Sequence, residues 1–159
     1  MEFDFVVEIP KGSRNKYEMG EDGRIHLDRT LYTATAYPTE YGYIDGSLGE
    51  DGDPLDGMLL TEAPTFPGCV VRARAIAMFR MTDEKGPDDK AFCVPVKDPR
   101  FEGLKDVSDI SPFEQAHIEH FFQVYKALEP GRFVSDLSWA DRAYAEQSIS
   151  EAIKRAEGA

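Results

Sequence analysis

Cysteines, long apolar runs and basic residues are all scarce in this sequence of 159 residues, and each shortage excludes a class of protein. Cys69 and Cys93 both lie in apolar stretches, which favours reduced core residues over a disulfide, and neither has a second cysteine or a histidine at zinc-finger spacing. No apolar run approaches the roughly 20 residues that a transmembrane helix needs. Residues 1–4 lack the basic start and apolar block of a secretory signal, so we expect a cytoplasmic protein.

The charge balance is strongly acidic, with 18 lysines and arginines against 30 aspartates and glutamates and a net charge of −12. Nucleic acids and anionic membrane surfaces both select for clusters of basic residues, so this balance argues against either partner. A polyanionic substrate would need positive charge from another source, and divalent cations are the obvious candidates. The length and a hydrophobic content of 42% are typical of one globular domain, which we expect to span residues 1–159.

The hydrophobic pattern predicts strands first and helices last. Between residues 68 and 81, apolar residues recur at alternate positions, the period of a long strand with one apolar face. Ser111 to Glu114 has the pattern of a capping box with proline at the first helical position, and Ser138 to Asp141 is expected to begin a second helix. This order predicts an α+β fold, a small barrel with helices packed on it. Further strands are predicted at residues 3–9 and 91–96, with shorter ones around 24–27, 58–61 and 132–134.

The densest functional signal is residues 51–57, where three carboxylates crowd into a turn rich in glycine and proline. Converging carboxylates repel one another unless a cation lies between them, and hard oxygen ligands suit Mg²⁺, Mn²⁺ or Ca²⁺. Taken alone, the segment is also compatible with a solvated acidic turn. An EF-hand fails on position, because Leu55 occupies the fifth loop position and Asp56 the sixth, where the loop requires glycine.

A second acidic cluster lies between the two long predicted strands. An acidic hairpin loop that stands alone serves solubility, but two clusters in one small domain favour a shared site for several metal ions, the usual device for phosphoryl hydrolysis. The cluster consists of Asp83, Glu84, Asp88 and Asp89, followed by Lys90. Cations and phenols that suit phosphate oxygens are scattered along the chain, at Lys16, Arg29, Tyr37, Tyr41, Tyr43, Tyr125 and Lys126. Each is an ordinary structural residue by itself and gains weight only from its association with the acids.

Taken together, these residues resemble family I soluble inorganic pyrophosphatases in their compact bacterial form. Residues 51–57 match the family's pattern of Asp-x-Asp-Pro-hydrophobic-Asp. The similarity runs from about residue 3 to residue 135 and keeps the family's order through residues 8–10, 15–18, 27–29, 37–38, 41–43, 83–84, 88–90 and 120–126. The resemblance implies an OB-like five-stranded β-barrel with two C-terminal helices, and hydrolysis of inorganic pyrophosphate to two orthophosphates.

The resemblance also implies a role for each matching position. Asp53 matches the acid that accepts the proton from an attacking metal-bound water or hydroxide. Several Mg²⁺ ions are implied, with Mn²⁺ or Zn²⁺ as substitutes and Ca²⁺ as an inhibitor, and bacterial members form homohexamers. The metal-binding positions are Glu8, Asp51, Asp56, Asp83 and Asp88. The substrate-binding positions are Lys16, Glu18, Arg29, Tyr41, Lys90, Tyr125 and Lys126.

Other functions fit the residues less well. A nucleic-acid-binding OB domain would share the barrel and stack bases on tyrosines, but it conflicts with the net charge of −12. A non-catalytic metal-binding module, or a phosphohydrolase acting on nucleotides or phosphoesters, stays open on the acids alone. Serine and cysteine hydrolases have no motif here, and His117 and His120 on the first predicted helix are expected at a surface or interface.

Overall fold

Five strands pair in a closed ring in the computed structural model, which describes residues 1–159. The ring runs β1–β4–β5–β8–β6 and closes because β6 also pairs with β1. Neighbouring strands are antiparallel except β5 and β8, which run parallel. The expected α+β fold with an OB-like five-stranded barrel is confirmed. The ring strands are β1 (Phe3–Ile9), β4 (Glu40–Ile44), β5 (Asp56–Leu59), β6 (Val70–Asp83) and β8 (Lys90–Pro95).

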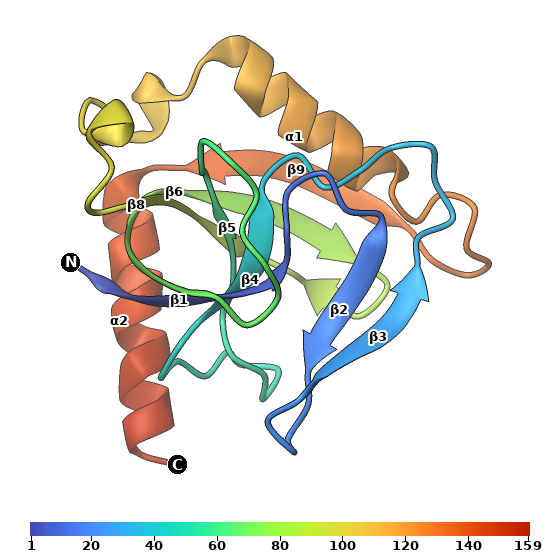
Figure 1. The fold of residues 1–159 in the computed structure, drawn as a ribbon, viewed down its shortest axis with the longest axis horizontal. Helices are drawn as coiled ribbons and strands as arrows, with labels where there is room; N and C mark the ends of the chain where they lie inside the picture. The colour runs from blue at the N-terminus through green and yellow to red at the C-terminus, as the bar shows by residue number, and fades with distance from the viewer.

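The remaining elements attach to this barrel. Figure 1 shows α1 and α2 on different sides of the barrel, with the hairpin of β2 and β3 projecting away from α2. Strands β7 (Gly86–Pro87) and β9 (Val134–Ala140) pair with β6, and β2 (Asn15–Met19) pairs only with β3 (Ile25–Thr30). The helices are η1 (Pro99–Phe101), η2 (Val107–Asp109), α1 (Pro112–Val124) and α2 (Arg142–Glu157). None of them combines the length and the apolar content that a membrane span requires.

The long strand β6 differs from its prediction in one respect. One apolar face was expected, but every residue from Ala75 to Phe79 is buried, because two apolar clusters share this strand. Ile76 and Phe79 belong to the cluster that includes α1, whereas Met78 belongs to the cluster that includes Ala145 of α2. A register irregularity between Ala75 and Ala77 marks the part of the strand that both clusters share.

One predicted helix start is confirmed and the other is wrong by a few residues. Ser111 caps α1, since its hydroxyl oxygen accepts a hydrogen bond from the backbone N–H of Glu114 at 3.2 Å. Ser138, expected to begin the second helix, lies instead in β9, paired with β6. The cap of α2 is Asp141, whose carboxylate accepts from the backbone N–H of Tyr144 at 2.9 Å. Strand pairing outweighs the capping preference of Ser138 because β6 offers an unpaired edge there.

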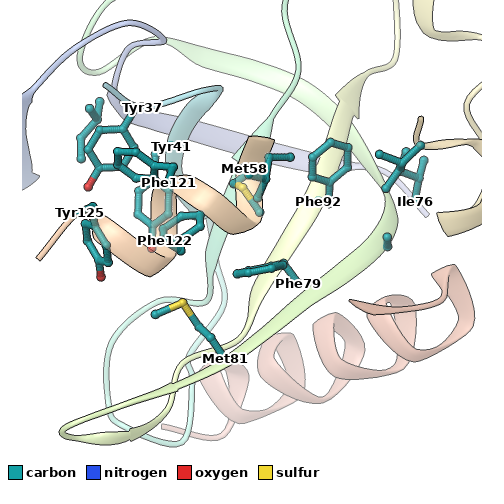
Figure 2. Packing of buried hydrophobic residues seen from close by; sticks show 14 of the residues in the cluster. Tyr37, Tyr41, Met58, Ile76, Phe79, Met81, Phe92, Phe121, Phe122 and Tyr125 are labelled. Carbon is teal, nitrogen blue, oxygen red and sulfur yellow. The ribbon is translucent and has the colours of Figure 1, made fainter. Parts of the chain in front are cut away.

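Aromatic residues pack α1 against the barrel. Figure 2 shows the rings of Tyr37, Tyr41, Phe121, Phe122 and Tyr125 gathered at one side of the larger apolar cluster. The Phe121 ring lies 4.6 Å from that of Tyr37 and 5.3 Å from that of Tyr125, measured between centroids. This packing holds the end of α1, and the residues that follow it, beside the barrel strands that carry the acidic segments.

Candidate active site

The parallel pairing of β5 and β8 brings the two acidic segments together. Asp56 begins β5 and Lys90 begins β8, and the register of the two strands places these residues next to each other. The Lys90 ammonium lies 2.9 Å from Asp88 Oδ2 and 3.9 Å from Asp56 Oδ2. From the neighbouring strand β4, the Tyr41 hydroxyl donates to Asp56 Oδ2 at 2.8 Å. Two clusters far apart in the sequence therefore form one charged region.

The pKa of Asp56 reflects this crowding. Burial raises it to about 6, although the ammonium of Lys90 and the hydroxyl of Tyr41 lower it and the charge of Asp88 adds to the rise. The side chain keeps 37% of its surface exposed, so the carboxylate is reachable from solvent. The protein thus leaves the negative charge of Asp56 only partly compensated.

The segment after α1 forms a second group of charges with the end of β6. The Lys126 ammonium lies 3.2 Å from Asp83 Oδ2 and 3.1 Å from Glu84 Oε2, and its side chain is only 6% exposed. Burial favours a higher pKa for Asp83, but the backbone N–H of Lys85 and the Lys126 ammonium hold it below its usual value. Glu84 Oε1, by contrast, is buried without any hydrogen-bond partner. A buried carboxylate oxygen in this condition is suited to a cation.

The β2–β3 hairpin contributes a third group. Lys16 donates to Glu18 at 2.6 Å and to Asp28 at 3.2 Å. Arg29 pairs with the adjacent Asp28 and, at 2.9 Å, with Glu129, which lies 100 residues further along the chain. The Nε atom of Arg29 is buried and has no partner in the protein. Each terminal nitrogen carries two N–H groups, so the guanidinium also has donors beyond those that Asp28 and Glu129 accept.

Glu8 links the hairpin to the barrel. Its carboxylate, on β1, accepts a hydrogen bond from the backbone N–H of Met19 at 2.8 Å. Burial raises the pKa of Glu8 to about 7; the Met19 bond lowers it, the charges of Asp56 and Glu18 raise it, and Lys16 lowers it. Charges from the barrel and from the hairpin both act on Glu8. It therefore lies between the group around Lys90 and Asp56 and the group on the β2–β3 hairpin.

Three buried tyrosines lie next to these charged side chains, and their phenols are protonated. Burial raises the pKa of Tyr37, Tyr41 and Tyr125 above the usual value, and the nearby carboxylates reinforce the effect. The Lys90 ammonium lies 5.3 Å from the centroid of the Tyr41 ring, and that of Lys126 lies 5.4 Å from the Tyr125 ring. The hydroxyl of Tyr41 already donates to Asp56, whereas those of Tyr37 and Tyr125 can donate hydrogen bonds to an anion without adding charge.

Asp51 and Asp53 lie in the exposed loop before β5. Gly52 between them has a φ of 89°, a conformation that favours glycine and that turns the chain sharply. Asp51 accepts a hydrogen bond from the backbone N–H of Asp53 at 3.0 Å, and its charge helps to raise the pKa of Asp56. The Asp53 carboxylate accepts no hydrogen bond from the protein and is open to solvent.

The structure gathers many of the predicted site residues into three groups of contacting charges, with two additions and one difference, and leaves the Asp53 carboxylate exposed without a contact to the others. Glu84 was noticed only as part of an acidic loop, and Glu129 carried no sequence signal because its partner Arg29 is remote in the chain. The carboxylates do not converge in threes on one point. Ammonium groups lie between them instead, with Lys90 between two carboxylates and Lys126 between two others.

Comparison with known proteins shows the family. A family model described as inorganic pyrophosphatase matches residues 5–157. The chain belongs to the inorganic pyrophosphatase family. The resemblance drawn from the sequence is thereby confirmed, and membership of the pyrophosphatase family implies an enzyme that depends on divalent metal ions.

Individual pyrophosphatases match over nearly their whole length. The inorganic pyrophosphatase of Streptomyces coelicolor is 58% identical over 98% of this chain and 96% of its own. That of Corynebacterium glutamicum is 52% identical over 98% of each chain. The crystal structure of inorganic pyrophosphatase from Thermus thermophilus has a TM-score of 0.96 with 42% identity, covering 99% of this chain and 92% of that one.

The residues present fit the divalent cations that the pyrophosphatase family implies. The donors are hard carboxylate oxygens, which Mg²⁺ prefers. Glu84 Oε1 has no partner within the protein, and burial raises the pKa of Glu8 and of Asp56 by more than their hydrogen bonds and neighbouring cations lower it. A cation among these oxygens would supply the missing compensation.

Proposed function

We propose that this protein hydrolyses inorganic pyrophosphate to two orthophosphates. The observation that carries the proposal is the pairing of buried or half-buried cations with carboxylates: Lys90, Lys126 and Arg29 each contact two acidic side chains. A compact polyanion such as pyrophosphate needs ammonium and guanidinium groups at short range, and it also needs the surrounding acids to be neutralised. This site provides the ammonium and guanidinium groups, and its carboxylates are ligands for the cations that would neutralise the acids.

Magnesium is the proposed cofactor, with Mn²⁺ or Zn²⁺ as substitutes. The support is the oxygen-only donor set and its distribution over three strands and two loops around one charged region. When bound, the ions supply Lewis-acid chemistry, because they neutralise phosphate charge and lower the pKa of the attacking water. The residues that would hold them are Glu8, Asp51, Asp56, Asp83 and Asp88.

The protein's own cations and phenols would bind and orient the two phosphate groups. Each terminal nitrogen of Arg29 carries two N–H groups, so the guanidinium has donors beyond those that Asp28 and Glu129 accept. The raised pKa of Tyr125 keeps its hydroxyl protonated as a donor, whereas the Tyr41 hydroxyl donates to Asp56 and would have to leave it to reach phosphate. Glu18 would hold Lys16 in place through their 2.6 Å contact. The substrate-binding set is Lys16, Glu18, Arg29, Tyr41, Lys90, Tyr125 and Lys126.

Asp53 is the proposed proton acceptor. It lies three residues before Asp56 in the same turn, and its exposed carboxylate has no competing donor from the protein. A general base must reach the proton of the attacking water, directly or through one further water, and the Asp53 carboxylate is free to do so because no group of the protein engages it. Removal of that proton by Asp53 would make the water a better nucleophile.

The direct test is phosphate release from pyrophosphate in Mg²⁺, with EDTA and ATP as controls. We expect rapid release from pyrophosphate plus Mg²⁺, none in EDTA and little from ATP. Release from ATP at a comparable rate would move the protein to the nucleotide phosphohydrolases. Binding of Mg²⁺ without any turnover would leave only a metal-binding module.

By resemblance we also propose a cytoplasmic homohexamer. Exposed apolar side chains such as Phe113 and Leu128, on and after α1, are available to such an assembly. Sedimentation velocity at micromolar concentration should give the mass of a hexamer, about six times 17.8 kDa. A monomer at that concentration would contradict the assembly without affecting the proposed reaction.

A further inference from the structure

Glu129 is a buried carboxylate with no assigned role. It is 7% exposed and lies in the turn that follows Tyr125 and Lys126. Both of its carboxylate oxygens face the same nitrogen of Arg29, with Nη2 at 2.9 Å from Oε1 and 3.1 Å from Oε2. A charged group is buried only where a partner offsets its desolvation, and Arg29 is the close partner here.

The contact determines how the Arg29 guanidinium is turned. Asp28 engages Nη1 and Glu129 engages Nη2, which leaves the buried Nε without a partner. The guanidinium is planar, so fixing both terminal nitrogens fixes the direction of every remaining N–H. Asp28 is exposed, whereas Glu129 is buried, and the buried contact is the one that water competes with least.

The same residue also connects two segments of the substrate-binding set. The backbone N–H of Glu129 donates to the carbonyl of Lys126 at 3.0 Å, so one residue joins the turn that carries Lys126 to the strand that carries Arg29. A second arginine, Arg132, pairs with Glu129 at 3.6 Å through its Nε atom, but its side chain is 42% exposed. Its contribution to the position of Glu129 is small by comparison.

We propose that Glu129 is a positioning residue that orients the Arg29 guanidinium toward a phosphate group of the substrate. The inference rests on the proposed pyrophosphatase function, within which it adds a residue that acts through Arg29. Glu129 itself does not touch the substrate. Its loss should therefore be felt only where Arg29 is present.

The test is a double-mutant cycle of Glu129→Gln with Arg29→Ala. Glutamine keeps the shape and one acceptor oxygen but removes the charge, so the Arg29 guanidinium is held less firmly, by Asp28 and a neutral acceptor. We expect KM for pyrophosphate to rise about tenfold with kcat within about threefold of the parent, since uniform binding is lost. In the Arg29→Ala background the same substitution should change KM by less than about twofold. Glu129→Asp, which keeps the charge, should recover part of the loss.

Glu119→Gln is the matched control. Glu119 is a half-buried acid on α1 that accepts from Trp139 Nε1 at 2.9 Å, so the change removes one charge from the same segment away from the site. It should leave KM unchanged. A merely structural role for Glu129 predicts the opposite pattern to ours: a lower Tm, unaltered KM per folded molecule, and an equal effect in both backgrounds.

The binding of inorganic phosphate separates this inference from the proposed function. In saturating Mg²⁺, calorimetry should show phosphate affinity about five- to tenfold weaker for Glu129→Gln than for the parent. If the parent does not hydrolyse pyrophosphate, the proposed function fails, and the phosphate titration alone decides the role of Glu129. Equal affinity in parent and variant, no phosphate binding by the parent, or an undiminished KM effect without Arg29 would each overturn the inference.

Discussion

Replacing Lys90 by methionine should destabilise the protein without divalent cations and leave it nearly as stable as the parent with them. Lys90 is 1% exposed, and its ammonium lies 2.9 Å from Asp88 and 3.9 Å from Asp56. Methionine keeps an unbranched stem beside the rings of Tyr41 and Phe122, whose centroids lie 5.3 and 5.4 Å from the ammonium. The substitution therefore removes mainly the charge.

The magnitude follows from these distances. At an effective dielectric constant of about 20, Coulomb's law gives about 6 kcal/mol for Lys90 with Asp88 and about 4 kcal/mol with Asp56, and desolvation offsets most of it. Removing one partner of a fully buried pair costs about 3–5 kcal/mol. The two acids are 27% and 37% exposed, so water screens part of the repulsion left behind. We expect a net loss of about 2–3 kcal/mol, which lowers Tm by about 4–12 °C for a chain of this length.

The assay is thermal unfolding in EDTA and again in saturating Mg²⁺. A cation held by Asp56 and Asp88 would replace the lost positive charge, so the difference in Tm between Lys90→Met and the parent should fall below about 3 °C in Mg²⁺. Lys85→Met is the control, because Lys85 is exposed in the same acidic loop and its ammonium forms no ion pair; it should change neither Tm. Equal losses with and without Mg²⁺, or no loss in EDTA, would refute the reasoning.

Three further predictions follow from the same charges. Asp53→Asn should lower kcat by about 10²–10⁴-fold with Mg²⁺ affinity retained, whereas Asp56→Asn should weaken Mg²⁺ binding in calorimetry; equal loss of affinity would make Asp53 a ligand. Burial raises the pKa of Glu8 from 4.5 to about 7 and that of Asp56 from 3.8 to about 6, so the folded chain holds more protons than the unfolded one in this window. Urea unfolding in EDTA should therefore show stability falling as pH rises from about 4 to 7, and a rise would contradict the sign. Ca²⁺ alone should not support phosphate release, because it prefers longer bonds and higher coordination, and robust turnover in Ca²⁺ would refute this.

The parts of the fold that could be predicted are those whose secondary structure is signalled by residues adjacent in the sequence and is kept in the folded protein. The alternation between residues 68 and 81 predicted β6, and Ser111 with Pro112 predicted the start of α1, because both signals depend only on neighbouring residues. The acidic turn was predictable for the same reason, since Asp51, Asp53 and Asp56 are held close by chain connectivity alone.

Two strands gave no such pattern. All residues of β2 are exposed or half-buried, so no apolar alternation marks it, and it is held by pairing with β3. Strand β4 lacks an apolar alternation for the opposite reason, because nearly all of its residues, including Gly42, are buried. A Cβ atom at Gly42 would lie 1.9 Å from the carbonyl oxygen of Val6, so glycine is required there by the close approach of β1. Glycine is a weak strand former, so its presence within β4 is explained only by the close approach of the neighbouring strand β1.

The site was predictable as a set of charges but not as a set of pairs. Arg29 and Glu129 meet across 100 residues, and Lys126 meets Asp83 across 43. Such contacts depend on how α1 is packed against the barrel, which involves the rings of Tyr37 and Phe121. Local sequence carries no information about that packing, so a residue such as Glu129 becomes visible only in three dimensions.

The pairing also explains how an acidic protein can recognise a polyanion. Lys90, Lys126 and Arg29 are each neutralised by two carboxylates, so pyrophosphate alone would meet cations already engaged and acids that repel it. Divalent ions on Asp56, Asp83 and Asp88 would release the ammonium groups of Lys90 and Lys126 for phosphate oxygens. Arg29 would keep its contacts, because Asp28 and Glu129 are not among the proposed metal ligands. Each ligand would then favour the binding of the other, and this coupling must be reciprocal. The affinity for phosphate should accordingly depend on Mg²⁺ concentration, and the affinity for Mg²⁺ should rise by the same factor when phosphate is present.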